Sequence, residues 1–210
     1  DDRRATITSQ IEHHAILHAC ASIERLGYPV AYLPVDNEGI VSPDILSSFI
    51  TDETRLVSVM LVNNEIGTIE PISELAKVAH SHGAVFHTDA VQAVGHIAIN
   101  VKELGVDMLS ASAHKFNGPK GIGFIYIKSG TKIYPYADGG AQEHGMRAGT
   151  ENIASIVGMA VALKKNCDHM DQTQNKLHKL EYKFLDVLKL SGIDYIRNGS
   201  ANHVPGNVNV

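Results

Sequence analysis

The feature that most constrains the fold of this chain is a short apolar run, Leu56–Val62. Such a run is typical of a parallel strand that helices cover on both faces. Similar runs stand at Ala5–Gln10, Pro29–Pro34, Ala84–Phe86 and Met108–Ala113, and segments with helix signals lie between them. This alternation predicts an α/β fold built on a mostly parallel sheet.

Helix start and stop signals support this prediction. We expect a helix over His13–Leu26, a short helix after the N-cap Ser42, and a third helix between Pro71 and Gly83. The run Gly123–Lys128 returns through a glycine-rich turn, so it is predicted to be an antiparallel strand.

The chain changes character after residue 150. Apolar residues recur at helical spacing and predict two longer helices. The first stripe is Ile153, Ile156, Val157, Ala160 and Val161, and the second is Leu177, Leu180, Phe184, Val187 and Leu188.

Composition limits the classes of function. The 210 residues suffice for one sizeable domain, and the net charge of −5 without a basic run argues against nucleic acid or an anionic membrane as partner. No apolar stretch approaches the ~20 residues of a membrane span, and no signal peptide is recognisable. Cys20 and Cys167 lack CxxC spacing, so neither a disulfide framework nor a zinc site is predicted. The expected compartment is the cytoplasm.

Lys115 is the first candidate for chemistry, because it follows the apolar run Met108–Ala113 and precedes a glycine-rich turn. A lysine at the end of a buried strand is unusual, since burying an ammonium group is costly unless the group is paired or neutralised. A lysine held partly neutral can form a Schiff base with an aldehyde cofactor. The alternative is that Lys115 is a solvent-exposed turn residue.

Asp89 ends another apolar strand, one strand–helix unit before Lys115. Pyridoxal phosphate needs a carboxylate against its pyridine nitrogen, so that the protonated ring can accept electrons. Ligands of open α/β sheets bind at the carboxyl ends of the strands. Asp89 and Lys115 are therefore predicted to face one pyridoxal phosphate from the ends of neighbouring strands.

Five motifs stand in order along the chain: Ile11–Ile16 (IEHHAI), Val62–Gly67 (VNNEIG), His87–Gln92 (HTDAVQ), Ser112–Gly123 (SAHKFNGPKGIG) and Gly139–Thr150 (GGAQEHGMRAGT). Together they resemble the class V aminotransferase group and, within it, the cysteine desulfurases of the NifS/IscS type. The resemblance implies the large domain of a pyridoxal-phosphate-dependent transferase of fold type I, with helices flanking a mostly parallel sheet and one antiparallel strand.

The resemblance also implies a domain organisation. Residues 1–168 would form the cofactor-binding large domain without its N-terminal part. Residues 169–210 would form a connecting helix and the start of a C-terminal small domain. Both ends of the chain are expected to be cuts within a longer protein.

Roles for the site residues follow from the resemblance. Lys115 would hold the cofactor and move protons at the substrate α-carbon, and His13 would stack on the ring and assist proton transfer. Asp89 would pair with the pyridine nitrogen. Gln92 would hydrogen-bond the phenolic oxygen of the cofactor, and Asn64 would lie near that oxygen and the substrate.

The phosphate would be held by Ser112 and His114, joined by Thr150 from a partner subunit, which implies a homodimer. The implied activity converts L-cysteine to L-alanine and leaves a persulfide on an enzyme cysteine, from which an acceptor or an iron–sulfur scaffold protein takes the sulfur. The family's nucleophilic cysteine and its substrate-binding arginine lie in the C-terminal part, and neither Cys20 nor Cys167 matches that cysteine. The isolated chain is therefore expected to be inactive.

Other interpretations stay open. A selenocysteine lyase or another class V enzyme would share the same cofactor shell, and a non-catalytic dimerisation or scaffold module is the alternative of another class. His14 competes with His13 for the stacking role, and Asn63 competes with Asn64. His87 is equally a satisfied core histidine or a site residue. No ligand pair has the compact spacing of an HExxH motif, so no metal site is predicted.

Overall fold

The computed structural model describes residues 2–210; Asp1, the first residue of the predicted large domain, lies outside the described residues. These residues form a six-stranded sheet with the strand order β2-β1-β3-β4-β5-β6. The strands are β1 (Ala5–Ser9), β2 (Val30–Leu33), β3 (Thr54–Ser58), β4 (Val85–Asp89), β5 (Met108–Ser112) and β6 (Gly123–Ile127). Strands β1 to β5 pair in parallel and β6 pairs antiparallel with β5. The predicted α/β fold and its antiparallel strand are confirmed.

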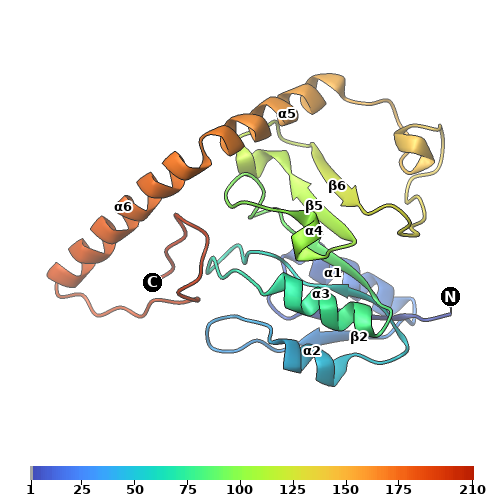
Figure 1. The fold of residues 1–210 in the computed structure, drawn as a ribbon, viewed down its shortest axis with the longest axis horizontal. Coiled ribbons are helices and arrows are strands. Elements are labelled where there is room, and N and C mark those ends of the chain that lie inside the picture. The colour runs from blue at the N-terminus through green and yellow to red at the C-terminus, as the bar shows by residue number, and fades with distance from the viewer. Residues whose placement is uncertain (1) are drawn as a thin grey trace.

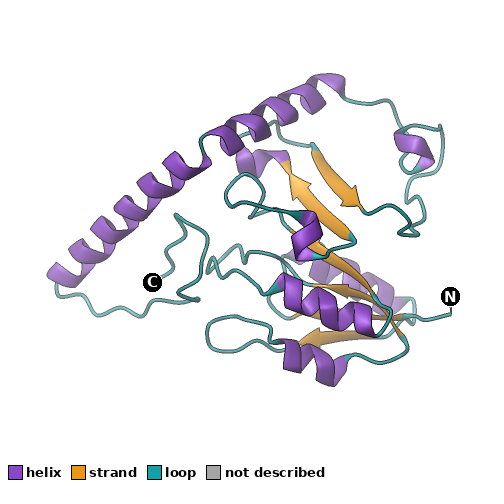
Figure 2. Ribbon diagram, in the orientation of Figure 1, coloured by secondary structure: helices purple, strands orange, loops and turns teal. Residues whose placement is uncertain are grey.

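Helices cover both faces of this sheet (Figures 1 and 2). They are α1 (His14–Arg25), α2 (Pro43–Phe49), α3 (Ile72–Ser81), α4 (Val101–Leu104), α5 (Ile153–Asp168) and α6 (Met170–Leu190). Helices α2, α3 and α4 pack side by side on one face, whereas α1 packs on β1 and β2 from the other. Right-handed crossovers require this arrangement, because the chain reverses its direction across the sheet between β2 and β3.

The core lies between the sheet and the helices. Val57 of β3 and Phe86 of β4 are paired in register and fully buried, and Leu46 of α2 and Leu75 of α3 pack in the same cluster. Burying one such side chain contributes about 1.5–3 kcal/mol. The apolar run that begins at residue 56 serves this core, although β3 ends at Ser58 and residues 59–62 continue beyond it without pairing to β1.

Helices α5 and α6 follow each other along one side of the molecule, and α6 projects away from the sheet (Figure 1). The segment 198–209 then returns to the loop that follows β3. The amide of Ile69 donates to the carbonyl of Asn202 (3.1 Å), and the amide of Val204 donates to the carbonyl of Gly67 (2.9 Å). The division into domains at residues 168 and 169 stays a prediction.

Candidate active site

The predicted site residues gather at the carboxyl ends of the parallel strands. Asp89 is the last residue of β4, Ser112 is the last residue of β5, and His13 follows β1 at the start of α1. The connection after β1 leads to β2 on one side, whereas the connection after its neighbour β3 leads to β4 on the other side, so the two connections leave in opposite directions. Such a reversal opens a crevice between the strands, which is where open α/β sheets bind their ligands.

The carboxylate of Asp89 is held in place at this edge. Its side chain is 7 % exposed, and its Oδ1 accepts the amide of Val91 at 2.9 Å. Its main chain is fixed from both neighbouring strands, because its carbonyl accepts the amide of Leu61 (2.9 Å) and Ala90 donates to the carbonyl of Ser110 (2.9 Å). Asp89 therefore offers an immobile negative charge at the crevice.

Lys115 lies on a short 3-10 helix, Ala113–Phe116, that directly follows β5. The Nε2–H of His96 donates to the carbonyl of Lys115 (2.9 Å), and the amide side chain of Asn166 on α5 donates to the carbonyl of Phe116 (2.7 Å). The main chain around Lys115 is thus anchored to two other segments.

The expectation that Lys115 is buried is wrong, because its side chain is exposed in this structure. In the 3-10 helix, Ala113 and Phe116 take the two buried positions and are fully inaccessible. The amine is therefore exposed on a turn that directly follows the carboxyl end of β5.

His13 is the N-cap of α1, and its Nδ1 accepts the amide of Ala15 at 3.1 Å. Because Nδ1 is an acceptor here, the neutral ring carries its proton on Nε2. His14 instead stacks on His18, with ring centroids 5.1 Å apart on the exposed side of α1. This geometry favours His13 over His14 as the residue that serves the site.

Asn63 and Asn64 differ in their burial and in their hydrogen-bond partners. Asn63 is buried; its Oδ1 accepts the amides of Glu65 (2.9 Å) and Ile66 (3.1 Å), and its Nδ2 donates to the carbonyl of Ile11 (2.9 Å). Asn64 is half-buried and donates to the adjacent Glu65 side chain (2.7 Å). Asn63 holds the loop, so Asn64 is the one whose amide can turn toward a ligand.

The remaining candidates lie on the same edge or in the loop before α5. Ser112 and His114 share a hydrogen bond of 2.8 Å between Oγ and Nδ1. Gln92 is half-buried in the turn after β4, and Thr150 is exposed in the loop that precedes α5. Their assignment to the cofactor stays a prediction.

His87 is a core residue in this structure. It is 8 % exposed, with Nδ1 bonded to Ser58 Oγ and Nε2 bonded to Ser110 Oγ, both at 2.8 Å. Burial lowers the pKa of His87, and the nearby Asp89 only partly offsets this effect. Both ring nitrogens of His87 are hydrogen-bonded within the sheet. Of the two interpretations that the sequence left open, the structure therefore favours the satisfied core histidine.

Glu12 is a buried acidic residue that no sequence pattern marks as functional. It is 4 % exposed, and its Oε1 accepts the hydroxyl of Ser9 (2.7 Å) and the amide of Met60 (2.9 Å). Its Oε2 is buried without a hydrogen-bond partner among the described residues. The only signal in the sequence was an acidic residue directly before His13 within the first motif.

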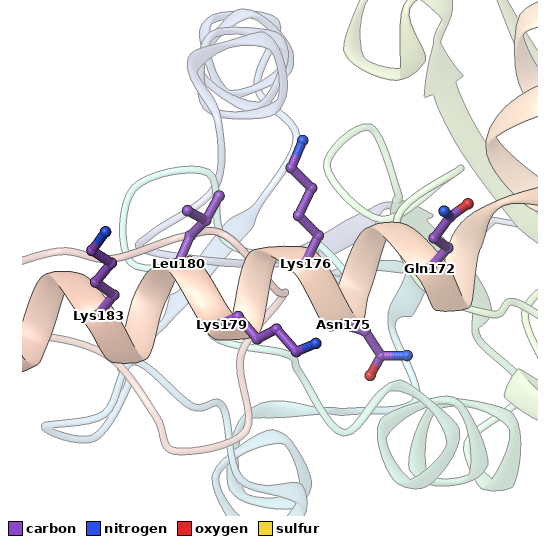
Figure 3. Close-up of a pocket in the computed structure, with 6 residues that line it drawn as sticks. All are labelled: Gln172, Asn175, Lys176, Lys179, Leu180 and Lys183. Atoms are coloured by element: carbon purple, nitrogen blue, oxygen red, sulfur yellow. The ribbon is translucent and has the colours of Figure 1, made fainter.

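Two surface hollows lie away from this edge. One runs along α6 and is lined by Gln172, Asn175, Lys176, Lys179, Leu180 and Lys183 (Figure 3). Its lysines project to different sides of the helix in Figure 3, so no polar groups converge there. The other hollow lies at the opposite edge of the sheet, around Asp107. The carboxylate of Asp107 already accepts hydrogen bonds from the amide of Phe86 (2.9 Å), from His80 (2.7 Å) and from Lys128 (3.3 Å).

Within residues 2–210, no three His, Cys, Asp or Glu side chains come together to hold a metal ion. In the same part of the chain, no helix combines the length and the apolar character that crossing a membrane requires.

Comparison with known proteins gives consistent results. All 210 residues match the family described as aminotransferase class-V. Cysteine desulfurase IscS of Dictyoglomus turgidum is 52 % identical over 204 residues, which are 97 % of this chain and 52 % of that protein. The chain spans about half the length of the curated relatives it matches.

Solved structures agree with this result. A NifS-like protein superimposes with a TM-score of 0.92 at 36 % identity, over 97 % of this chain and 56 % of the other. SspA in complex with cysteine superimposes with a TM-score of 0.75 at 39 % identity, over 78 % of this chain and 48 % of the other. Since the family match extends from the first residue to the last, this chain belongs to the class V aminotransferase family.

Proposed function

We propose that this chain is the cofactor-binding part of a pyridoxal-phosphate-dependent cysteine desulfurase. The reaction converts L-cysteine to L-alanine and leaves the sulfur as a persulfide on an enzyme cysteine. The observation that carries the proposal is the pairing at the crevice edge: a buried, fixed carboxylate, Asp89, ends β4, and the exposed amine of Lys115 follows the neighbouring parallel strand β5. The 52 % identity with a cysteine desulfurase supports the same substrate.

The side chains at this edge fit pyridoxal phosphate. The cofactor needs a carboxylate for its pyridine nitrogen and a primary amine for its aldehyde, and Asp89 and Lys115 supply these two groups. Its phosphate needs polar hydrogen donors, and the bonded pair of Ser112 and His114 lies next to Lys115. When bound, the cofactor supplies a ring that accepts electron density from the substrate α-carbon.

The residues of this chain have distinct tasks in the proposed reaction. Asp89, held by the amide of Val91, keeps the facing nitrogen protonated. Lys115 would hold the aldehyde and would then move the proton at the α-carbon, and the bond from His96 fixes the main chain that carries its side chain. His13 would serve the ring and would donate from Nε2, because its Nδ1 already accepts the amide of Ala15.

Neither cysteine of the described residues suits the role of sulfur acceptor. Cys20 is buried in α1, and burial raises the pKa of its thiol, which lowers the thiolate fraction that nucleophilic attack needs. Cys167 is exposed in the last turn of α5, but it does not match the position of the family's nucleophilic cysteine. We place the acceptor thiol and the arginine for the substrate carboxylate outside residues 1–210.

We likewise propose that the protein is a cytoplasmic homodimer, in which Thr150 of one subunit reaches the phosphate in the site of the other. The sulfur would be delivered to an acceptor protein or to an iron–sulfur scaffold protein.

Borohydride reduction of the full-length protein with pyridoxal phosphate, followed by peptide mapping, tests the cofactor and its anchor. Reduction turns the link between the aldehyde and an amine into a stable adduct, which we expect on the peptide that contains Lys115. The Lys115→Ala variant should lose this adduct, whereas Lys120→Ala, which removes an exposed lysine of the same segment, should keep it. An adduct spread over several surface lysines would contradict the role of Lys115.

Product analysis separates the competing activities. A cysteine desulfurase releases alanine from L-cysteine in step with protein persulfide. Turnover of selenocysteine without turnover of cysteine would identify a selenocysteine lyase. Absence of cofactor absorbance in the full-length protein would favour a non-catalytic scaffold and refute the proposal.

A further inference from the structure

Strands β1 and β3 separate at the crevice edge, and this separation leaves one backbone amide without a strand partner. Beyond β3, the amides of Val59 and Leu61 donate to the carbonyls of His87 (3.2 Å) and Asp89 (2.9 Å) on the β4 side. The amide of Met60, between them, points toward β1. The pairing of β1 with β3 has by then ended at Ser58, so no strand carbonyl of β1 meets that amide.

The side chain of Glu12 takes the place of the missing strand carbonyl. Its Oε1 accepts the amide of Met60 at 2.9 Å and also the hydroxyl of Ser9 at 2.7 Å. A second bond, from Asn63 Nδ2 to the carbonyl of Ile11 (2.9 Å), ties the same two segments together. A buried backbone amide without a hydrogen-bond partner is costly, so the bond from the Met60 amide to Glu12 stabilises the open end of the crevice.

The surroundings of Glu12 disfavour a negative charge. Its other oxygen, Oε2, is buried without a hydrogen-bond partner among the described residues. The charged groups that face it are carboxyl groups, Asp89 at the end of β4 and Glu70 beyond β3, and the thiol of Cys20 faces it from α1. Burial, with a smaller contribution from Asp89, raises the pKa of Glu12 to about 7, although the bonds from Ser9 and Met60 act in the opposite direction.

The main chain links this carboxyl group to the site residues on either side. His13 follows Glu12 directly and begins α1 by accepting the amide of Ala15. Leu61 follows Met60 directly and holds the carbonyl of Asp89. A hydrogen-bonded path therefore runs from His13 through Glu12 and the residue 60–61 segment to Asp89.

We propose that Glu12 is a positioning residue that acts in its uncharged, protonated form: it replaces a strand carbonyl for Met60 and so sets His13 relative to Asp89. An acid without charge serves this purpose because it adds no second negative charge directly beside Asp89. The effect on the cofactor rests on the proposed function, whereas the protonation state and the placement of His13 do not.

The protonation state is measured first, on the protein without cofactor. An infrared difference spectrum between the wild type and Glu12→Gln should show a carboxylic acid carbonyl band below neutral pH. This band should titrate with a midpoint near a pKa of about 7. The exposed Glu53 supplies the matched control, since Glu53→Gln should remove carboxylate bands only. A Glu12 signal that is mainly carboxylate at about pH 6 would overturn the proposal, because the group would then be charged in the folded protein at neutral pH.

The placement of His13 is measured next, through the ring nitrogen shifts of 15N-labelled histidine, assigned with His13→Gln. Glu12→Gln keeps an oxygen acceptor for Met60 without any charge, so the His13 signals should match those of the wild type at about pH 6. Glu12→Ala removes the acceptor and should shift the His13 signals. Glu12→Asp shortens the side chain and should do the same.

Cofactor binding completes the test. We expect Glu12→Gln to bind pyridoxal phosphate within about twofold of the wild type and Glu12→Ala to bind about tenfold more weakly, the loss that goes with one hydrogen bond at a buried amide. A Gln variant as impaired as the Ala variant would show that the charge is needed, which contradicts the proposal. If Glu12→Ala does not fold, the cofactor affinity of Glu12→Gln relative to the wild type still decides whether a charge on Glu12 is needed. If no variant binds the cofactor, the infrared and histidine signals still decide the role of Glu12, and the proposed function alone fails.

Discussion

Glu70 is a second buried carboxyl group near the crevice, and it makes stability depend on pH. Its Oε2 accepts the amide of Val41 (2.9 Å), its Oε1 has no partner among the described residues, and burial, the largest cause, raises its pKa from 4.5 to about 8. Between these two values the folded state binds more protons than the unfolded state. The free energy of unfolding therefore falls as the pH rises through this window.

The substitution Glu70→Gln should weaken this dependence, because glutamine keeps the acceptor for Val41 and does not ionise. Urea denaturation at about pH 5 and about pH 8 should show the wild type losing several kcal/mol more than the variant, at about 1.4 kcal/mol per unit of pKa shift. The exposed Glu74 supplies the control Glu74→Gln, which should behave as the wild type. Equal losses in wild type and Glu70→Gln would show that Glu70 ionises normally in the folded state.

His87 gives the opposite dependence. Burial lowers its pKa in the folded state below the ordinary value of 6.5, so the unfolded state binds more protons and stability falls as the pH decreases below about 6.5. The variant His87→Leu leaves the hydroxyls of Ser58 and Ser110 without their partner and should cost about 1–3 kcal/mol at about pH 7.5.

The difference between the free energies of unfolding of the wild type and His87→Leu should narrow toward about pH 5, because only the wild type has a histidine here that gains a proton on unfolding. Chemical denaturation at the two pH values measures this change. The exposed His18 on α1 is the matched position, and His18→Leu should show no such narrowing. A constant difference for His87→Leu would mean that the folded and unfolded pKa values are alike.

At the scale of elements, Asn166 joins α5 to the turn that carries Lys115. Its Nδ2 donates to the carbonyls of Phe116 (2.7 Å) and Ala162 (2.8 Å), and its Oδ1 accepts from Asn117 (3.3 Å). The rigidity of the 3-10 helix thus depends on a helix that lies far away in the sequence.

Truncation by Asn166→Ala should lower stability by about 1–2 kcal/mol, because the Phe116 carbonyl loses its partner. Hydrogen exchange of the peptide 112–118 should accelerate, and the borohydride adduct on Lys115 should decrease. The neighbouring Lys165 is exposed, and Lys165→Ala should leave both signals unchanged. Unaltered exchange in Asn166→Ala would show that the turn is rigid without α5.

At the scale of the whole molecule, the segment 198–209 supports the loop that carries Asn64. Gly199 has φ +90°, and a Cβ there would lie 2.6 Å from the carbonyl oxygen of Ile66. Gly192, after α6, also has a positive φ (+71°) but has no atom within 4 Å of such a Cβ. Comparing the same substitution at the two glycines therefore separates the effect of backbone strain from the effect of the contact between the segment and the loop.

Gly199→Ala should be less stable than the matched variant Gly192→Ala by about 1–3 kcal/mol, since it adds a clash to the strain of a positive φ. Limited proteolysis should cut the segment 198–209 faster in Gly199→Ala, and hydrogen exchange around Ile66 should increase. Equal behaviour of the two variants would indicate that the contact with Ile66 contributes no support.

Much of the fold could be predicted from local patterns. The apolar runs became strands β1 to β5, with ends no more than four residues from the expected ones, and Ser42 caps α2 by accepting the amide of Ile45 (3.2 Å). The four-residue helix α4 was missed, because it has no apolar stripe to reveal it. The run that begins at Leu56 was read as one strand, although its second half leaves β1.

The sequence by itself determined the order of strands and helices along the chain and the antiparallel return of β6, since these depend on local periodicity and on turn residues. Only the tertiary structure decided that Lys115 is exposed, that His87 is satisfied within the sheet, and that Glu12 bridges β1 and β3. The physical reason is that burial and hydrogen-bond partners come from residues distant in the chain, such as Met60 for Glu12. No local pattern reports on such partners.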